Sequence, residues 1–145
     1  MPVLDVTAQT EIAAEPTDVA SVMFDPQRER EWIAEVERVD VIDPAIRPGA
    51  RVRRTGRFLG QDVVWSTAVE SFHFPHALVL QVTDGPFAGT FTYQIQRGGT
   101  GSVVRIRARG ELSMPGAALA AMAEAPMRAA LDANLGRLKT IVEKK

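Results

Sequence analysis

Three side chains in this sequence are candidates for moving a proton, namely Glu70, Tyr93 and His73. A carboxylate, a phenol or an imidazole acts as a general acid or base when it lies within about 3 Å of the atom that gains or loses the proton. None of the three belongs to a catalytic signature, because the chain contains no G-x-S-x-G sequence and its serines have no evident base partner. The catalytic residues are therefore unknown from the sequence, which leaves open whether the protein is an enzyme.

Metal and cofactor chemistry are disfavoured by the residue types present. The chain has no cysteine, which excludes thiolate catalysis, thiolate zinc sites and iron–sulfur clusters. Its two histidines, His73 and His76, flank Pro75 in a predicted turn, without a third donor at ligand spacing. The glycine-rich segment 98–101 joins two strand-like segments and does not precede a helix, so it is predicted to be a hairpin turn and not a phosphate loop. We expect no metal and no cofactor.

Two charged side chains fall among apolar residues on predicted strands. Alternation in the segment 50–60 places Arg54 on one face together with Val52, Gly56 and Phe58. The same counting in 62–73 places Glu70 on one face together with Val64, Ser66, Ala68 and Phe72. An unpaired buried charge is costly, so Arg54 and Glu70 are candidates for a buried ion pair. Trp65 and Val69 lie on the opposite face, and a shift of one residue would expel both charges, so the inward face stays open.

The elements that must position these side chains follow from the hydrophobic period. A period of two runs through 3–13, 35–43, 50–60, 62–73, 76–84, 87–97 and 102–112, which predicts seven strands. Between the first two strands the pattern is helical and is interrupted at Asp25-Pro26, which predicts two short helices reaching Trp32. After Gly116 a helical stripe continues for about 27 residues, and Pro126 is expected to kink or divide this helix, unless two helices follow one another.

This order of elements predicts an α+β fold in a single domain spanning residues 1–145. Short turns favour antiparallel pairing, so the expected architecture is a curved seven-stranded antiparallel sheet wrapped around the long C-terminal helix. Charge placement adds one detail, because Arg105, Arg107 and Arg109 share the polar face of the last strand while Asp5 and Glu11 share that of the first. The first and last strands are therefore expected to pair.

Composition argues against several classes of partner. The chain has 17 basic and 18 acidic residues and a formal charge of -1, so no strong field attracts nucleic acid. No apolar run approaches the roughly 20 residues of a membrane helix, which argues against integral membrane association. The first residues lack the basic region and long apolar stretch of a signal peptide, so we expect a cytoplasmic protein. No clear determinant of a homodimer is present, and that assembly stays open.

Several strings along the chain resemble the SRPBCC superfamily of START-like and Bet v 1-like proteins, most closely its bacterial polyketide cyclase/dehydrase-like branch. They are IAAEPTDVASVMFDPQREREWI, PGARVRRTG, VWSTAVESFHFPHALVLQV, GGTGSVVRIRARGEL and NLGRLKTIVEKK, and together they cover essentially the whole chain. The resemblance implies a helix-grip fold with a deep cavity between the concave sheet and the long helix, usually holding a lipid, steroid, polyketide or other apolar small molecule. Relatives include enzymes, carriers, hormone receptors and chaperone regulators, so the resemblance leaves the function open.

The leading hypothesis is that an apolar small-molecule ligand binds beneath the terminal helix. The apolar and aromatic side chains that we expect around it are Trp32, Phe58, Phe72, Phe91, Tyr93, Met122, Met127 and Leu131, and the polar anchors are Arg54, Glu70, Asn134 and the hydroxyl of Tyr93. Methionine and aromatic residues at such spacing more often simply fill a core.

Two other classes of function remain. One is a cofactor-independent cyclase, dehydratase or isomerase in which Glu70, Tyr93 or His73 moves a proton. The other is a partner-binding module without a ligand, for which we would expect an exposed apolar patch or a client-linked tail. The sequence shows neither of these features.

Overall fold

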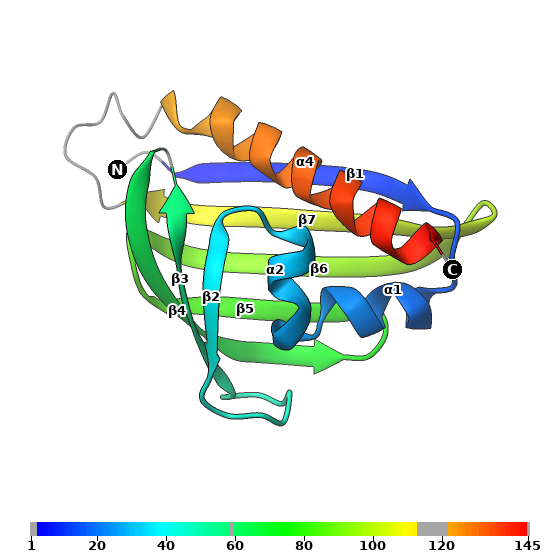
Figure 1. Ribbon diagram of the computed structural model, residues 1–145, viewed down its shortest axis with the longest axis horizontal. Helices are drawn as coiled ribbons and strands as arrows, with labels where there is room; N and C mark the ends of the chain where they lie inside the picture. Colours follow the sequence, from blue (N-terminus) through cyan, green and yellow to red (C-terminus); the bar gives the residue numbers. More distant parts are fainter. Residues whose placement is uncertain (1–2, 59, 113–121, 145) are drawn as a thin grey trace.

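The computed structural model describes residues 3–58, 60–112 and 122–144, and within them seven strands form one antiparallel sheet (Figure 1). The strands are β1 (Leu4–Ile12), β2 (Val36–Val41), β3 (Arg51–Phe58), β4 (Gln61–His73), β5 (Ala77–Asp84), β6 (Phe87–Gly98) and β7 (Gly101–Leu112). Their order across the sheet is β1-β7-β6-β5-β4-β3-β2, so only the β1–β7 pair joins strands that are not consecutive in the chain. The predicted α+β fold with a seven-stranded antiparallel sheet is confirmed.

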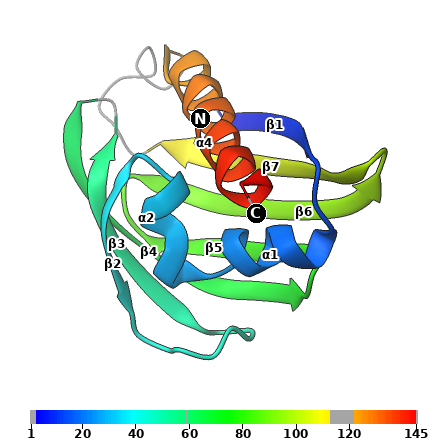
Figure 2. The same cartoon turned by 45° about the vertical axis from the view of Figure 1, so that its right-hand side comes forward.

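The sheet is strongly curved, because β2, β3 and β4 bend around one end of the molecule while the other strands run side by side (Figures 1 and 2). Burial alternates along β3, where Val52, Arg54 and Gly56 are buried and face the concave side. Gly56 also permits a close approach, since a Cβ there would lie only 1.7 Å from the backbone oxygen of Glu35. That contact holds the segment before β2 against the sheet.

The first and last strands pair as their charges predict. In the register Asp5 lies opposite Arg109, and Nη2 of Arg107 lies 2.6 Å from Oδ2 of Asp5. Further along the same pair of strands, Arg105 donates to Oε1 of Gln9. These pairs are exposed to solvent, so each contributes little to stability.

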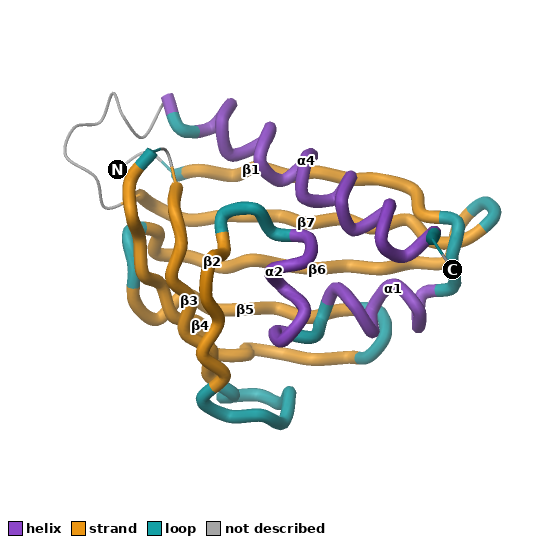
Figure 3. The backbone as a smooth tube through the Cα atoms, in the orientation of Figure 1, coloured by secondary structure: helices purple, strands orange, loops and turns teal. Residues whose placement is uncertain are grey.

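All the described helices lie on the concave face of the sheet (Figure 3). They are α1 (Pro16–Met23), the 3-10 turn η1 (Pro26–Arg28), α2 (Glu29–Trp32) and α4 (Glu124–Glu143). Asp25 begins η1 by accepting a hydrogen bond from the backbone nitrogen of Gln27, at 2.9 Å. The two short helices predicted between the first two strands are thus present, and the long C-terminal helix packs over the sheet as the helix-grip fold requires.

The start of the terminal helix differs from the prediction. Residues 116–121, where the helical stripe was expected to begin, lie outside the described residues. Pro126 falls in the first turn of α4, where its missing N–H would have no helical partner anyway, so it does not kink the described helix. Met122 precedes α4 and is 70% exposed. The stripe buried on α4 begins at Met127, and Met122 is not among the described residues that line the cavity beneath this helix.

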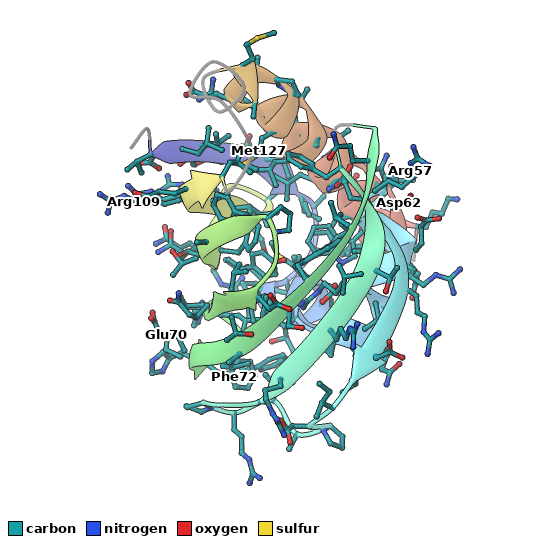
Figure 4. All side chains as sticks on the ribbon, turned by 90° about the vertical axis from the view of Figure 1, so that its left-hand side faces the viewer. Arg57, Asp62, Glu70, Phe72, Arg109 and Met127 are labelled. Carbon is teal, nitrogen blue, oxygen red and sulfur yellow. The ribbon has the colours of Figure 1, made fainter. Side chains whose placement is uncertain are left out.

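Glu70 lies on the outer face of β4, and a bulge at this position changes which residues beyond it point inward. Val69 lies opposite Leu80 of β5 and Ser71 lies opposite Val79, so Glu70 is the extra residue between them. An extra residue reverses the alternation of side chains beyond it. The inner face of β4 therefore carries Thr67 and Val69 before the bulge and Phe72 after it, and Glu70 is exposed. Figure 4 shows the Glu70 side chain on the outer surface.

Candidate functional site

A cavity of about 130 Å³ lies between the inner face of the sheet and the first half of α4. Strands β3 to β7 supply one wall, and α2 with the segment leading into β2 supplies another. The side chains around it are mostly aliphatic and aromatic, including Val36, Leu80, Val82, Phe87 and Ile106. Figure 4 views the molecule from the β3–β4 end, with Met127 between α4 and the sheet. The described part of the chain thus borders an apolar space at the position where the helix-grip fold predicts a cavity.

Most of the side chains predicted to bind a ligand line this cavity. They are Trp32, Arg54, Phe58, Phe91, Tyr93, Met127, Leu131 and Asn134. Phe72 does not line it and packs instead against Phe24, with ring centroids 6.2 Å apart. His73 is exposed at the end of β4, and Glu70 and Met122 also lie outside the cavity. Of the three proton-transfer candidates, only Tyr93 is placed in the cavity.

Arg54 is buried in the cavity wall and is paired with Glu29 instead of Glu70. Its Nε and Nη2 atoms lie 2.5 Å and 2.7 Å from the two carboxylate oxygens of Glu29, and its Nη1 donates to Oγ1 of Thr67 at 2.7 Å. Burial acts to lower the pKa of Arg54, but the charge and hydrogen bonds of Glu29 outweigh burial and raise it. The guanidinium is therefore charged and is neutralised within the wall.

The Tyr93 side chain lies between this ion pair and two aromatic rings. Its ring stacks against Phe24 at a centroid distance of 6.3 Å and meets Trp32 edge-on at 6.0 Å. Burial, with a further contribution from the negative charge of Glu29, raises the pKa of the Tyr93 hydroxyl well above its ordinary value. The hydroxyl is therefore protonated at every physiological pH and is a hydrogen-bond donor and acceptor.

Asn134 joins α4 to the segment between α2 and β2. Its Oδ1 accepts from the backbone nitrogen of Ala34 at 3.2 Å and from Nη2 of Arg137, and its Nδ2 donates to Oε1 of Glu35 at 2.7 Å. Nε of Arg137 donates to the backbone oxygen of Trp32 at 3.1 Å. We call Asn134, Arg137 and their partners on this segment the polar latch. Because the amide is already paired, Asn134 fixes the cavity wall more than it offers a free group to a ligand.

Sequence reasoning missed the two residues that hold Arg54, namely Glu29 and Thr67. Glu29 precedes Trp32 by three positions on α2, a spacing that places both side chains on one face of a helix. That spacing was a usable signal, although a four-residue helix gives little periodicity. Thr67 was missed because it lies on the face of β4 opposite to Glu70, and alternation alone does not say which face is the inner one.

A metal site is not formed by the described residues. No group of three or more His, Asp or Glu side chains lies close enough to hold a metal ion in the described ranges. One of the two histidines has a contact with the backbone: Nδ1 of His76, between β4 and β5, lies 2.9 Å from the backbone oxygen of Ile95.

A family of known proteins matches nearly all of this chain. The family described as "Polyketide cyclase / dehydrase and lipid transport" matches residues 3–143. The chain belongs to this family. The resemblance read from its sequence strings, to the polyketide cyclase/dehydrase-like branch of the SRPBCC superfamily, is thereby confirmed. A comparison with curated proteins gives no significant match.

Solved structures with the same fold match nearly the whole chain of this family member. A protein from Thermus thermophilus has a TM-score of 0.84 at 22% identity, with 95% of this chain and 96% of that chain covered. The Zhui aromatase/cyclase from Streptomyces sp. R1128 has a TM-score of 0.84 at 14% identity, covering 99% and 95%. A START superfamily protein from Mycobacterium smegmatis has a TM-score of 0.79 at 17% identity, covering 98% and 97%. At these identities the likeness establishes the fold alone.

The described helices of this polyketide cyclase/dehydrase and lipid transport family member include none that is long and apolar enough to cross a membrane.

Proposed function

We propose that this protein binds a small, uncharged, apolar molecule in the cavity beneath α4. The observation that carries the proposal is the cavity itself, an apolar space between the sheet and α4. Concave, mostly apolar pockets with a few polar groups are the usual form of small-molecule sites. Membership of a family described by polyketide chemistry and lipid transport supports the same function.

The size and charge of the cavity limit the class of ligand that it can bind. A volume of about 130 Å³ is close to that of an engineered apolar cavity of about 150 Å³ that binds benzene, so the apolar part of the ligand is expected to be one or two rings. Arg54 and Glu29 neutralise each other in the wall, and the other charged residue of the described lining, Glu35, is acidic, so this lining offers no free positive charge to an anionic ligand. An uncharged aromatic or polyketide-type ring compound therefore fits better than a fatty acid anion.

Two neighbouring alanines of α4 provide a sharp test. Ala130 lines the cavity, whereas Ala129 is exposed on the same helix. An Ala130→Trp variant should fill the cavity and lose binding of 1-naphthylamine, an uncharged fluorophore, while Ala129→Trp should bind it as the wild type does. Native mass spectra of freshly purified protein, compared with denatured spectra, should show an adduct in the wild type and in Ala129→Trp only. Equal binding by both variants, or none by the wild type, would argue against the proposal and favour the partner-binding module.

A second candidate function is a cofactor-independent cyclase or dehydratase. The placement of Tyr93, a protonated phenol, beside the Glu29–Arg54 pair in the cavity wall favours it, and an aromatase/cyclase shares the fold. Turnover of a poly-ketone chain by the wild type, with a loss of rate in Tyr93→Phe and unchanged rates in Glu70→Gln and His73→Gln, would support this function. Absence of turnover, with binding intact, would leave the protein as a binder.

A further inference from the structure

A second, smaller cavity lies beyond the Glu29–Arg54 pair. It has a volume of about 20 Å³ and is bordered by the end of α1, by η1 and by the inner face of β3, β4 and β5. Its lining is mostly apolar and includes Met23, Ile46 and Leu78, none of which lines the cavity beneath α4. The interior of the described chain is thus divided into a larger and a smaller space.

Among the described residues, four side chains line both cavities and so form the partition between them, namely Glu29, Arg54, Leu80 and Tyr93. The ion pair is held by two hydrogen bonds between its partners and by a third from Arg54 to Thr67. The Tyr93 ring is packed against two other aromatic rings. Leu80 is buried and has no polar group, so it is the member of the partition that can be shortened without leaving a buried charge unpaired.

We propose that this partition limits the length of the ligand, and that Leu80 is the side chain that sets the limit. This inference rests on the proposed binding function and adds the shape of its ligand. A molecule beneath α4 that extended past Leu80 would have to displace a packed aromatic ring or a buried ion pair, and both are costly to move. The favoured ligand is therefore a compact ring compound with at most a short side chain, whereas a long acyl chain meets the partition.

A series of alkylbenzenes measures the limit. The dissociation constants of toluene through n-hexylbenzene are obtained from their displacement of 1-naphthylamine. Each methylene that fits beneath α4 should tighten binding by about fourfold, and the gain should stop where the chain reaches the partition. The Leu80→Ala variant should join the two cavities and extend the gain by about three methylenes, because leucine has three more side-chain carbons than alanine.

Leu78→Ala is the matched control. It removes the same atoms from the same strand, and Leu78 is similarly buried but lines the smaller cavity and not the one beneath α4. The chain length at which the gain stops should therefore be the same as in the wild type. Leu80→Val, which keeps a branched side chain suited to a strand, is the milder variant if Leu80→Ala does not fold, and it should extend the gain by about one methylene.

Two methionines report on where the alkyl chain lies. Met127 lines the cavity beneath α4, and Met23 lines the smaller cavity. Their methyl signals in a ¹H–¹³C spectrum are assigned with the Met23→Leu and Met127→Leu variants. In the wild type n-hexylbenzene should shift the Met127 signal alone, and in Leu80→Ala it should shift both signals. Toluene should shift the Met127 signal alone in both proteins, which distinguishes a joined cavity from a general loosening of the fold.

The outcomes separate this inference from the binding function on which it rests. Affinity that rises through n-hexylbenzene in the wild type, with a shift of the Met23 signal, would overturn the partition and leave the binding function intact. The same limit in the wild type, Leu78→Ala and Leu80→Ala would overturn the role of Leu80. Failure of the wild type to bind 1-naphthylamine or any alkylbenzene would overturn both the partition and the binding function. A limit that lengthens in Leu80→Ala but not in Leu78→Ala would establish the partition.

Discussion

The buried pair of Arg54 and Glu29 makes a stability prediction at the level of single residues. Replacing Arg54 with methionine leaves the Glu29 carboxylate buried without a partner, which should lower the free energy of unfolding by about 3–5 kcal/mol. The exposed pair of Arg107 and Asp5 is the control, and Arg107→Met should lower the free energy of unfolding far less, because water screens this pair. Urea unfolding of both variants measures the difference. Equal losses would mean that water reaches the Arg54–Glu29 pair in solution.

Tyr93 leads to a prediction about how stability depends on pH. Because it is the single tyrosine of the chain, its titration can be followed by absorbance without interference from another phenol. Its raised pKa means that the folded protein keeps the phenol proton at a pH where the unfolded chain, with a tyrosine pKa of about 10, loses it. The folded state then binds more protons, so the contribution of Tyr93 is fully present below about pH 10 and falls as the pH rises further. Tyrosinate absorbance should appear at an ordinary pH in urea and only at higher pH in the folded protein. Coincident titrations would contradict the buried position of Tyr93.

Arg54 and its partner show which parts of the site can be predicted from the sequence. Arg54 was correctly grouped on one face with Val52 and Gly56, because alternation is regular along β3, and the structure shows that this face is the buried one. The partner predicted for Arg54 was wrong. Glu70 lies on the outer face of β4, and the actual partner, Glu29, comes from a helix 25 positions earlier in the chain. A hydrogen bond between distant segments depends on how the elements pack, and hydrophobic period alone carries no information about it.

At the level of elements, alanine substitutions at two glycines should have opposite effects on stability. Gly56 lies on β3, where a Cβ would meet the backbone oxygen of Glu35 at 1.7 Å, so Gly56→Ala forces β2 and β3 apart. We expect it to destabilise the fold by more than about 2 kcal/mol. Gly136 lies on α4, where an added methyl group would have no atom within 4 Å, so Gly136→Ala should stabilise by about 1 kcal/mol through helix propensity. Thermal unfolding of the two variants tests both signs at once.

The polar latch leads to a prediction about how the contacts of α4 affect stability and the release of a ligand from the cavity. Asn134→Ala removes the hydrogen bonds that tie α4 to the segment at Ala34 and Glu35, and should cost about 1–3 kcal/mol of stability. Dissociation of 1-naphthylamine, followed by stopped-flow fluorescence, should become faster because that segment forms part of the cavity wall. Asp132→Ala, an exposed change on the same helix, should alter neither quantity. An unchanged dissociation rate in Asn134→Ala would show that the ligand leaves by another route.

Elements were predicted well wherever the hydrophobic period ran without interruption. All seven strands and both short helices were recognised, since glycine, proline or aspartate turns separate most of these elements. Errors arose at local irregularities. The bulge at Glu70 inverts the pattern of β4 after Val69, and α4 begins at Glu124, so that Met122 falls outside the buried stripe. A bulge has no compositional signature strong enough to be read from a single strand.

At the scale of the whole molecule, a curved sheet and one helix leave an apolar space that the side chains do not fill. Empty apolar space in a core forgoes packing energy, so a protein that keeps it gains stability when a ligand enters. The expected gain follows from mass action, and a ligand at one hundred times its dissociation constant stabilises the folded state by about 2.7 kcal/mol. For a domain of this size that corresponds to a rise in melting temperature of about 5–10 °C.

This linkage yields a prediction that needs no knowledge of the natural ligand. Saturating 1-naphthylamine should raise the melting temperature of the wild type and of Ala129→Trp by the same amount, because both keep the cavity lined by Ala130 open. The Ala130→Trp variant should show no rise, and its melting temperature without ligand should change less than that of a variant that opens space, such as Leu131→Ala. The shift should also grow with the logarithm of ligand concentration, as binding to the folded state alone requires. A rise of equal size in Ala130→Trp would place the bound fluorophore outside the cavity.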